Sequence, residues 1–385
     1  LCPACRQAPW EDHFIDYVVK LCHHLQAKGI RHIGMWNDSF VRGGRMNQAL
    51  ADRFAREGLT DAVVLHWWQY HDYYDSIHPE LGLTRWVVPM TGYFYWTNYY
   101  DHLDNIYLAL RKGHEQGAQG TEAYGLFNRC FDRQFHCLAD YAWKRDATTR
   151  LAEFRDKYVR KLYGERWAEV SEAFRYFDEA VYGQYASFPA GLFYYTYAYA
   201  SSPESAHVRA NYPQAILAQL LDNPMQSLGR LREIREELAK ARRIWSAVPA
   251  RDAAQTELAW ILDLEAQRIQ VVTDLFLRLV DLLKGYKHLQ ARGPASREAA
   301  MGELRKGGAE LDALLAELDE LMARTEGQPD AYLAPQSLRE LSLMRRFVTT
   351  LAGELAGITA RLEAGELPAL PDLAAMACQP VAWPD

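Results

Sequence analysis

The chain has few cysteines, with only six among its 385 residues. A scaffold built on disulfides needs a much higher density of cysteine, so that class is excluded. No apolar run approaches the ~20 residues that span a bilayer, and we expect no membrane partner. The formal net charge is −7 and no Lys/Arg run stands out. A nucleic-acid partner normally requires a basic patch, so it is not expected either.

Motifs for common cofactors and catalytic centres are also missing. The phosphate-binding sequences G-x-x-x-x-G-K-[ST] and G-x-G-x-x-G are absent, as are H-E-x-x-H and G-x-S-x-G. We therefore expect no cofactor. Cys2 and Cys5 have the C-x2-C spacing of a zinc knuckle, but no clear second pair accompanies them. A lone pair of this kind is a weak zinc candidate, and no metal is expected.

The distribution of aromatic residues divides the chain into two regions. Eight of the 11 Trp lie at or before Trp167, and after about Ser201 the sequence becomes rich in Leu, Ala, Glu and Arg with helical periodicity. In the first region, short apolar runs alternate with amphipathic helices, which predicts βα units and a parallel sheet. We predict an α/β fold with a partial (β/α)8 barrel over 1–147, a helical bundle domain over 148–366 and an extended tail over 367–385.

The first region contains about four βα units. Apolar runs predict strands over 31–36, 61–68, 84–89 and 117–124, and helical periodicity predicts helices over 12–28, 47–57, 102–113 and 131–143. A complete barrel needs eight such units and typically ~250 residues. The sequence therefore predicts the C-terminal half of a TIM barrel, with the first half upstream of Leu1. Because no start or signal peptide is recognisable there, the compartment is unknown.

Aromatic rings follow every predicted strand, and carboxylates follow three of the four. Active sites of parallel βα folds lie at these carboxyl ends. Sugars present apolar C–H faces that pack on aromatic rings, and hydroxyl groups that need polar partners. The pattern therefore predicts a carbohydrate-binding site. Its candidate substrate-binding residues are Trp36, Asp38, Trp67, Trp68, Tyr70, Tyr93, Tyr95, Trp96, Glu122 and Tyr124.

Structural roles are the alternative for individual residues. An aromatic side chain at a strand end can simply pack in the core. Asp38 can cap a helix or stabilise a turn, and Glu122 can form a buried salt bridge. His66 and His71 are expected to be packing or loop residues rather than ligands.

Two segments resemble the barrels of family 20 glycoside hydrolases and their relatives. The run from Cys2 to Asp38, CPACR…YVVKLCHHLQAKGIRHIGMWND, is similar to the stretch that follows the catalytic Asp-Glu pair of that family. The segment GAQGTEAYGLFNRCFDRQFHCLADYAW is similar to the end of related hexosaminidase-like barrels. The resemblance covers roughly residues 1–160. It implies that the strands of this chain are the fifth to eighth of a barrel.

This resemblance implies a retaining β-N-acetylhexosaminidase chemistry. In that family the acetamido oxygen of the substrate attacks the anomeric carbon, an Asp orients the acetamido group, and a Glu protonates the leaving oxygen. The pair sits at the end of the fourth strand, so it is expected upstream of this chain, and no catalytic residue is assigned here. By the same resemblance Trp36 and Trp67 or Trp68 would wall the acetamido and sugar pocket, Tyr93 or Tyr95 would donate to the acetamido oxygen, and Glu122 would bind sugar hydroxyls. Asp38 would either bind hydroxyls or support side chains that contact the sugar.

Two departures from the family keep other functions open. The first predicted strand ends in Trp-Asn-Asp, and the last carries Glu-Ala-Tyr where the family usually has Trp-x-Glu. A glucuronidase-like or other barrel glycosidase and a non-catalytic carbohydrate-binding protein are the alternatives. We expect a glycoside hydrolase for the complete protein and no turnover by this chain alone. The apolar faces of the helical region are compatible with a homo-oligomer.

Overall fold

A computed structural model describes residues 10–37, 48–68, 76–92, 101–125, 129–143, 150–181, 224–248, 252–291, 294–327 and 334–366. The chain divides into two compact units. The first, here called the sheet unit, comprises Leu1–Tyr93, His102–Leu126 and Arg133–Phe154. The second, the helical unit, comprises Phe94–Asp101, Phe127–Asp132 and Arg155–Asp385. The predicted tail over 367–385 lies outside the described residues.

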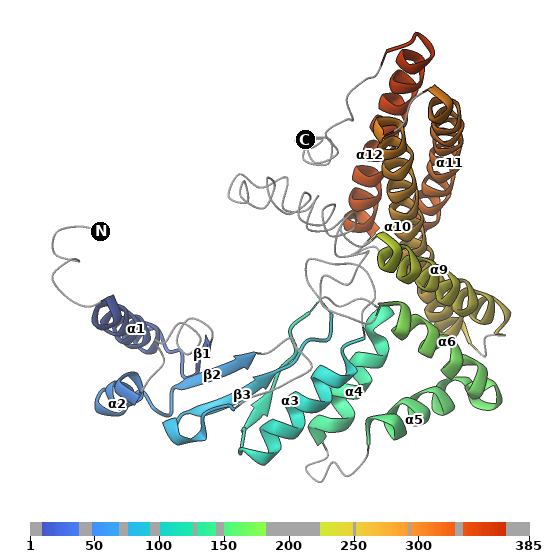
Figure 1. The fold of residues 1–385 in the computed structure, drawn as a ribbon. Helices are drawn as coiled ribbons and strands as arrows, with labels where there is room; N and C mark the ends of the chain where they lie inside the picture. The colour runs from blue at the N-terminus through green and yellow to red at the C-terminus, as the bar shows by residue number, and fades with distance from the viewer. Residues whose placement is uncertain are drawn as a thin grey trace. The chain divides into compact units, whose positions relative to one another are not determined.

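The sheet unit alternates helices with strands, and its four strands form one parallel sheet in the order β1-β2-β3-β4 (Figure 1). Its helices are α1 (Trp10–Ala27), α2 (Gln48–Arg56), α3 (Leu103–Glu115) and α4 (Asp132–Trp143). Its strands are β1 (Ile33–Trp36), β2 (Val63–Trp68), β3 (Thr84–Val88) and β4 (Gly120–Thr121).

The predicted mixed α/β class is confirmed, with four parallel strands followed by a mostly helical region. The described strands form an open sheet, so closure into a barrel stays a prediction. The fourth strand is much shorter than the predicted 117–124. Pairing continues irregularly beyond it, because Glu122 and Tyr124 donate their backbone N–H groups to the carbonyls of Val87 and Pro89.

Strand alternation gives the sheet two different faces. Side chains of successive residues point to opposite sides of a strand, so in-register neighbours share a face. One face forms a buried core with helices α1 and α2. Its members include Ile33, Val63 and Leu65 from the strands, Val18, Val19 and Cys22 from α1, and Leu50 and Phe54 from α2.

The opposite face, here called the aromatic face, carries large side chains in register. Trp36 pairs with His66, and His66 pairs with Trp86 across the three strands. Trp36 is 41% exposed, and the other two are half-buried. The sheet therefore has one face that stabilises the fold and one whose side chains remain accessible.

For the helical region, helical periodicity predicts helices over 151–162, 166–182, 227–246, 253–289, 296–324 and 335–363. The helices observed there begin and end within three residues of these spans. Helix α10 packs along α9 and α11, α11 packs along α12, and α6 packs along α9. A further predicted helix, over 213–220, lies outside the described residues. The described helices are α5 (Leu151–Tyr163), α6 (Trp167–Val181), α9 (Pro224–Ala247), α10 (Ala253–Ala291), α11 (Pro294–Glu326) and α12 (Ala334–Glu363).

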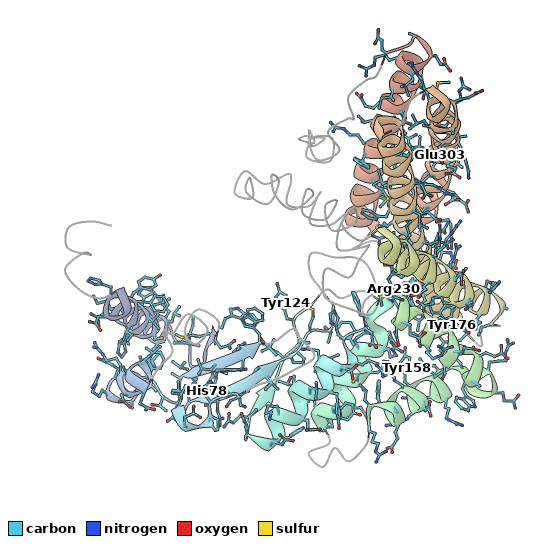
Figure 2. All side chains as sticks on the ribbon, viewed as in Figure 1. His78, Tyr124, Tyr158, Tyr176, Arg230 and Glu303 are labelled. Carbon is cyan, nitrogen blue, oxygen red and sulfur yellow. The ribbon has the colours of Figure 1, made fainter. Side chains whose placement is uncertain are left out.

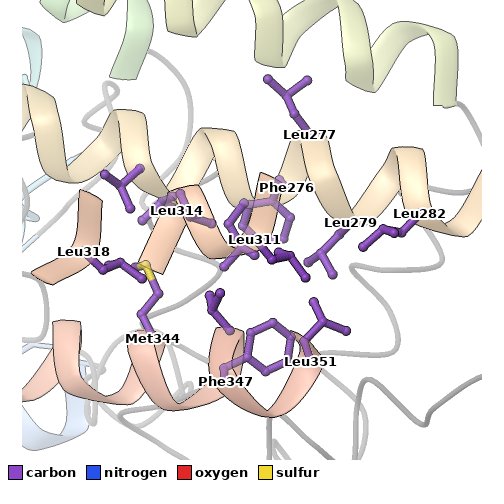
Figure 3. Packing of buried hydrophobic residues seen from close by; sticks show 14 of the residues in the cluster. Phe276, Leu277, Leu279, Leu282, Leu311, Leu314, Leu318, Met344, Phe347 and Leu351 are labelled. Carbon is purple, nitrogen blue, oxygen red and sulfur yellow. The ribbon is translucent and has the colours of Figure 1, made fainter. Parts of the chain in front are cut away.

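Leucine-rich stripes hold helices α10, α11 and α12 together (Figure 3). Leu311, Leu314 and Leu318 recur at helical spacing on α11 and are buried against Phe276 of α10 and Phe347 of α12. Such spacing places one apolar stripe per helix toward its neighbours. Among the described residues, no helix combines the length and the apolar character needed to cross a membrane.

Candidate functional site

Four aromatic rings gather on the aromatic face, near the carboxyl ends of the strands. The rings of His66 and Trp86 stack, with centroids 5.6 Å apart and planes 20° apart. Trp36 meets His66 edge-on at 5.7 Å and meets Tyr124 edge-on at 5.9 Å. Edge-on and stacked pairs of this kind are the arrangements that ring quadrupoles favour. These four residues, together with Glu122, are called the aromatic cluster below.

Glu122 is the acidic member of the aromatic cluster. Its Oε1 atom lies 2.6 Å from Nδ1 of His66, and the side chains of His66 and Glu122 are 16% and 37% exposed. The contact fixes the imidazole orientation through one nitrogen and leaves the other, Nε2, for a different partner. A neutral imidazole that donates from Nδ1 accepts at Nε2, whereas a protonated one donates from both.

Two glycines make room for the flat rings. A Cβ atom on Gly34 of β1 would lie 2.8 Å from Nε2 of His66. A Cβ atom on Gly120 of β4 would lie 2.7 Å from the indole of Trp86. Real side chains do not approach that closely, so both rings occupy space that any larger residue would fill. The lack of side chains at these two positions lets the rings lie across the neighbouring strands.

Buried asparagines fix the backbone where the strands end. Asn37, which follows β1, accepts the backbone N–H of Trp68 at 3.0 Å through Oδ1. Asn105 of α3 accepts the N–H of Met90 in the same way at 2.9 Å. Both asparagines are almost completely buried. Each of these bonds satisfies a backbone N–H group just beyond or at the end of a strand, which holds the strand ends that carry the aromatic cluster.

Three predicted site residues, Trp36, Glu122 and Tyr124, come together in the aromatic cluster. A fourth, Trp68, is half-buried and shares the aromatic face, two residues after His66. The structure therefore brings residues from β1, β2 and the segment after β4 to one edge of the sheet, as the positions of strand ends predicted.

Trp67 does not join them. It is 6% exposed on the opposite face, and its ring lies 5.1 Å from the ring of His78. Figure 2 labels Tyr124 and His78 at well-separated positions in the sheet unit. Alternation along β2 makes Trp67 and Trp68 point in opposite directions, so of these two residues Trp68 is the one that shares a face with Trp36. The remaining candidates, Asp38, Tyr70, Tyr93, Tyr95 and Trp96, lie outside the described residues, as do Cys2 and Cys5.

Sequence reasoning missed two members of the aromatic cluster. It treated His66 as a packing or loop residue and did not single out Trp86. The sequence offers one indication of their position, which is that side chains two residues apart on a strand share a face. His66 lies two residues before Trp68, and Trp86 lies in the middle of an apolar run. Parity alone does not give the register between strands, which is what aligns both residues with Trp36.

No metal site is apparent in the described part of the chain. Its His, Cys, Asp and Glu residues do not form a group of three or more that could hold an ion. Cys22, Cys130 and Cys137 are buried, and none of the three forms a disulfide among the described residues. Burial raises the pKa of the Cys22 thiol, which favours the neutral form and makes this side chain a poor nucleophile.

Comparisons with known proteins support the fold rather than a family. The chain matches no protein-family model, and a search of curated proteins finds no relative. Among solved structures it is similar to a glycoside hydrolase of family 138, described as an enzyme targeting pectin rhamnogalacturonan II, with a TM-score of 0.51 and 12% sequence identity. The match covers 88% of this chain and 58% of the other. The chain thus has a glycoside hydrolase-like fold and spans little more than half the length of that enzyme.

Proposed function

We propose that the protein is a carbohydrate-active protein whose aromatic face binds a glycoside. The observation that carries this proposal is the aromatic cluster itself. Accessible indole rings offer flat apolar surfaces for the C–H faces of a sugar, and the His66–Glu122 pair offers acceptor and donor atoms for its hydroxyl groups. The glycoside hydrolase-like fold supports the same interpretation.

The more specific proposal is a β-N-acetylhexosaminidase-like hydrolase. In it, residues 1–147 belong to a (β/α)8 barrel, and Glu122 binds sugar hydroxyls beside the wall formed by Trp36. The acetamido oxygen of the substrate would act as nucleophile, with an Asp-Glu pair from another strand supplying the orienting group and the acid. The aromatic cluster contains four aromatic rings and one carboxylate. A neutral sugar with an acetamido group fits this composition.

The test is a calorimetric titration with N,N′,N″-triacetylchitotriose. We expect Trp36→Ala to weaken binding about tenfold, because an aromatic contact contributes roughly 0.5–1.5 kcal/mol beyond its buried area. The matched control is Trp143→Ala, since Trp143 is 88% exposed on α4, outside the aromatic cluster. Equal affinity of Trp36→Ala and the wild type for the trisaccharide would contradict the proposal.

Aryl glycosides distinguish the more specific proposal from its glycosidase alternative. Hydrolysis of an aryl N-acetyl-β-glucosaminide, but not of an aryl β-glucuronide, by the complete protein would support the hexosaminidase-like chemistry. The reverse preference would support the glucuronidase-like alternative. Sugar binding without hydrolysis of either compound would leave a carbohydrate-binding protein.

A further inference from the structure

Helix α1 carries an exposed apolar strip. Its members Tyr17, Leu21 and Ile30 are 62%, 39% and 42% exposed, and they are three of the five large hydrophobic side chains that are exposed among the described residues. We propose that this strip docks an amphipathic helix whose apolar stripe is flanked by Asp or Glu. The inference goes beyond the proposed function and does not depend on it, because α1 packs on the buried face of the sheet, opposite the aromatic face.

The helical repeat places the apolar strip on one flank of α1. Val18 and Cys22 are buried in the core, and successive residues of a helix are rotated by about 100°. Tyr17 and Leu21 each precede one of these buried residues, so they point sideways from the core. Lys20 lies two residues from both Val18 and Cys22, and it therefore points almost directly away from the core.

The other flank of α1 is covered by α2 (Figure 1). Oδ1 of Asp16 lies 3.3 Å from Nη2 of Arg53, and Nε2 of His23 lies 3.2 Å from Oε2 of Glu57. Asp16 and His23 lie on the side of α1 away from Leu21, as their spacing along the helix requires. Helix α1 thus has one flank that is matched by a neighbouring helix and a second flank that exposes apolar side chains.

The end of α1 lengthens the apolar strip. Gly29 has a φ of 87°, its N–H donates to the carbonyl of Gln26, and the N–H of Ile30 donates to the carbonyl of Leu25. In a helix end of this type, the side chain after the glycine commonly packs against the last turn. Ile30 thus extends the apolar row past the end of α1. A row of residues four positions apart is the ridge that packs into the groove of another helix.

Basic side chains border the apolar strip, and they determine the charge of the partner. The residues one turn from Tyr17 and Leu21 within α1 are apolar or are His13, Lys20 and His24, and none of them is acidic. Lys20 is positively charged at neutral pH, and the two histidines can take up a proton. A helix with Asp or Glu beside its stripe would place carboxylates opposite these groups. A second copy of α1 would instead bring like charges together.

A lipid surface fits this flank less well than a helix does. An amphipathic helix that lies on a membrane turns its apolar side toward the lipid. On α1 the side chains that point away from the core are those of Lys20 and His24, which are exposed and polar. The apolar strip points sideways, where a second helix can lie along α1.

Fluorescence anisotropy with two labelled synthetic peptides tests the proposal. Both peptides form helices of about six turns with the same leucine stripe, which is flanked by Glu in one and by Lys in the other. Each is used at a concentration at which it is monomeric. We expect the glutamate peptide to bind the full chain at least about tenfold more tightly than the lysine peptide at low salt, because a few exposed ion pairs together supply that ratio. High salt should reduce the difference.

Two variants identify the parts of the site. Leu21→Ser should weaken binding of the glutamate peptide about tenfold, since it removes an apolar contact at the centre of the strip. Lys20→Glu should reduce the preference for the glutamate peptide. The corresponding controls are Trp143→Ser on α4 and Lys161→Glu on α5, because both side chains are exposed and lie outside the strip. Urea unfolding checks that each variant folds like the wild type.

Every other outcome overturns the proposal. Equal or tighter binding of the lysine peptide contradicts the charge of the partner, and no binding of either peptide, or unchanged binding in Leu21→Ser, contradicts the docking site. A dimer in sedimentation velocity that Leu21→Ser abolishes would assign the strip to a second copy. Binding to phosphatidylserine vesicles that the same variant abolishes would assign it to a membrane. None of these results changes the expected sugar binding, because the strip and the aromatic cluster share no residue.

Discussion

At the scale of single residues, the aromatic cluster depends on two glycines, which have no side chain to occupy the space of its rings. The imidazole of His66 lies over Gly34, and the indole of Trp86 lies over Gly120. Both glycines pair within the sheet, where a larger side chain is ordinarily favoured because it adds packing. Their presence is explained by the close approach of a ring rather than by backbone conformation.

Gly34→Ala is predicted to move His66. The new Cβ would stand 2.8 Å from Nε2, so the ring must shift and its 2.6 Å contact with Glu122 must lengthen. We expect sugar affinity to fall about tenfold and the protein to lose roughly 1–3 kcal/mol of stability, the usual cost of overpacking. Titration calorimetry and urea unfolding measure the two effects.

A matched glycine distinguishes this clash from a general effect of alanine. Gly302 lies within α11, and no atom lies within 4 Å of the Cβ that an alanine would add there. Gly302→Ala should be neutral or stabilising by roughly 0.5–1 kcal/mol, because glycine disfavours a helix interior. If Gly34→Ala is as stable as Gly302→Ala and keeps its sugar affinity, the imidazole of His66 does not occupy the space over Gly34.

Sequence analysis can place a residue at one edge of the sheet where the end of a strand alone decides its position. Trp36, Glu122 and Tyr124 could be placed there because each lies at or near the end of a predicted strand, whereas their role in binding a sugar stays a prediction. His66 and Trp86 could not, because they lie inside runs that look like core. Their exposure follows from strand register, which a single sequence does not specify. The contact between Glu122 and His66 spans 56 positions along the chain and depends on that register.

At the scale of elements, buried hydrogen bonds hold the strand ends in place. Asn37 continues the pairing of β1 and β2 beyond the last strand residue, because its N–H donates to the carbonyl of His66 and its side chain accepts from Trp68. One residue thus connects the strand that carries Trp36 with the strand that carries His66.

Asn37→Ala is predicted to loosen this junction. The N–H of Trp68 would lose the Asn37 acceptor in a partly buried place, which costs about 1–3 kcal/mol. The amide of Trp68 should then exchange with solvent much faster than in the wild type, while amides in the middle of β2 keep most of their protection. Hydrogen exchange followed by NMR measures both, and unchanged protection of Trp68 would contradict the assigned bond.

Elements were predictable to different degrees. Helical periodicity gave the helices α10, α11 and α12 within two residues of their observed ends. Each has a long buried stripe, so the signal repeats over many turns. The fourth strand was predicted at 117–124 and is only Gly120–Thr121, because a short run with two glycines carries little signal. Closure into a barrel depends on elements other than the four described strands, so it stays a prediction.

At the scale of the whole molecule, charge buried in the helical unit gives its stability a pH dependence. Asp274 of α10 has a side chain that is 8% exposed and lies 2.9 Å from Nε of Arg235. Burial raises the pKa of Asp274 more than the charge of Arg235 lowers it. A raised pKa in the folded state stabilises the fold below the usual pKa of aspartate, and this contribution is lost as the pH rises through the raised value.

Asp274→Asn should therefore flatten the acid side of the stability profile. We expect the variant to be no less stable than the wild type at neutral pH and to gain less stability on acidification. Urea unfolding followed by circular dichroism, repeated across the acid range, measures the slope. Asp312→Asn is the control, because Asp312 is exposed on α11. An unchanged slope in Asp274→Asn would assign the pH dependence to other groups.

The central claim, that a glycoside binds on the aromatic face, is tested most directly by fluorine NMR. Tryptophan would be replaced by 5-fluorotryptophan, each signal assigned by a single Trp→Phe variant, and the protein titrated with triacetylchitotriose. We predict that the signals of Trp36 and Trp86 shift with a common dissociation constant while that of the exposed Trp143 does not. Saturable shifts elsewhere, with Trp36 and Trp86 unmoved, would contradict the claim.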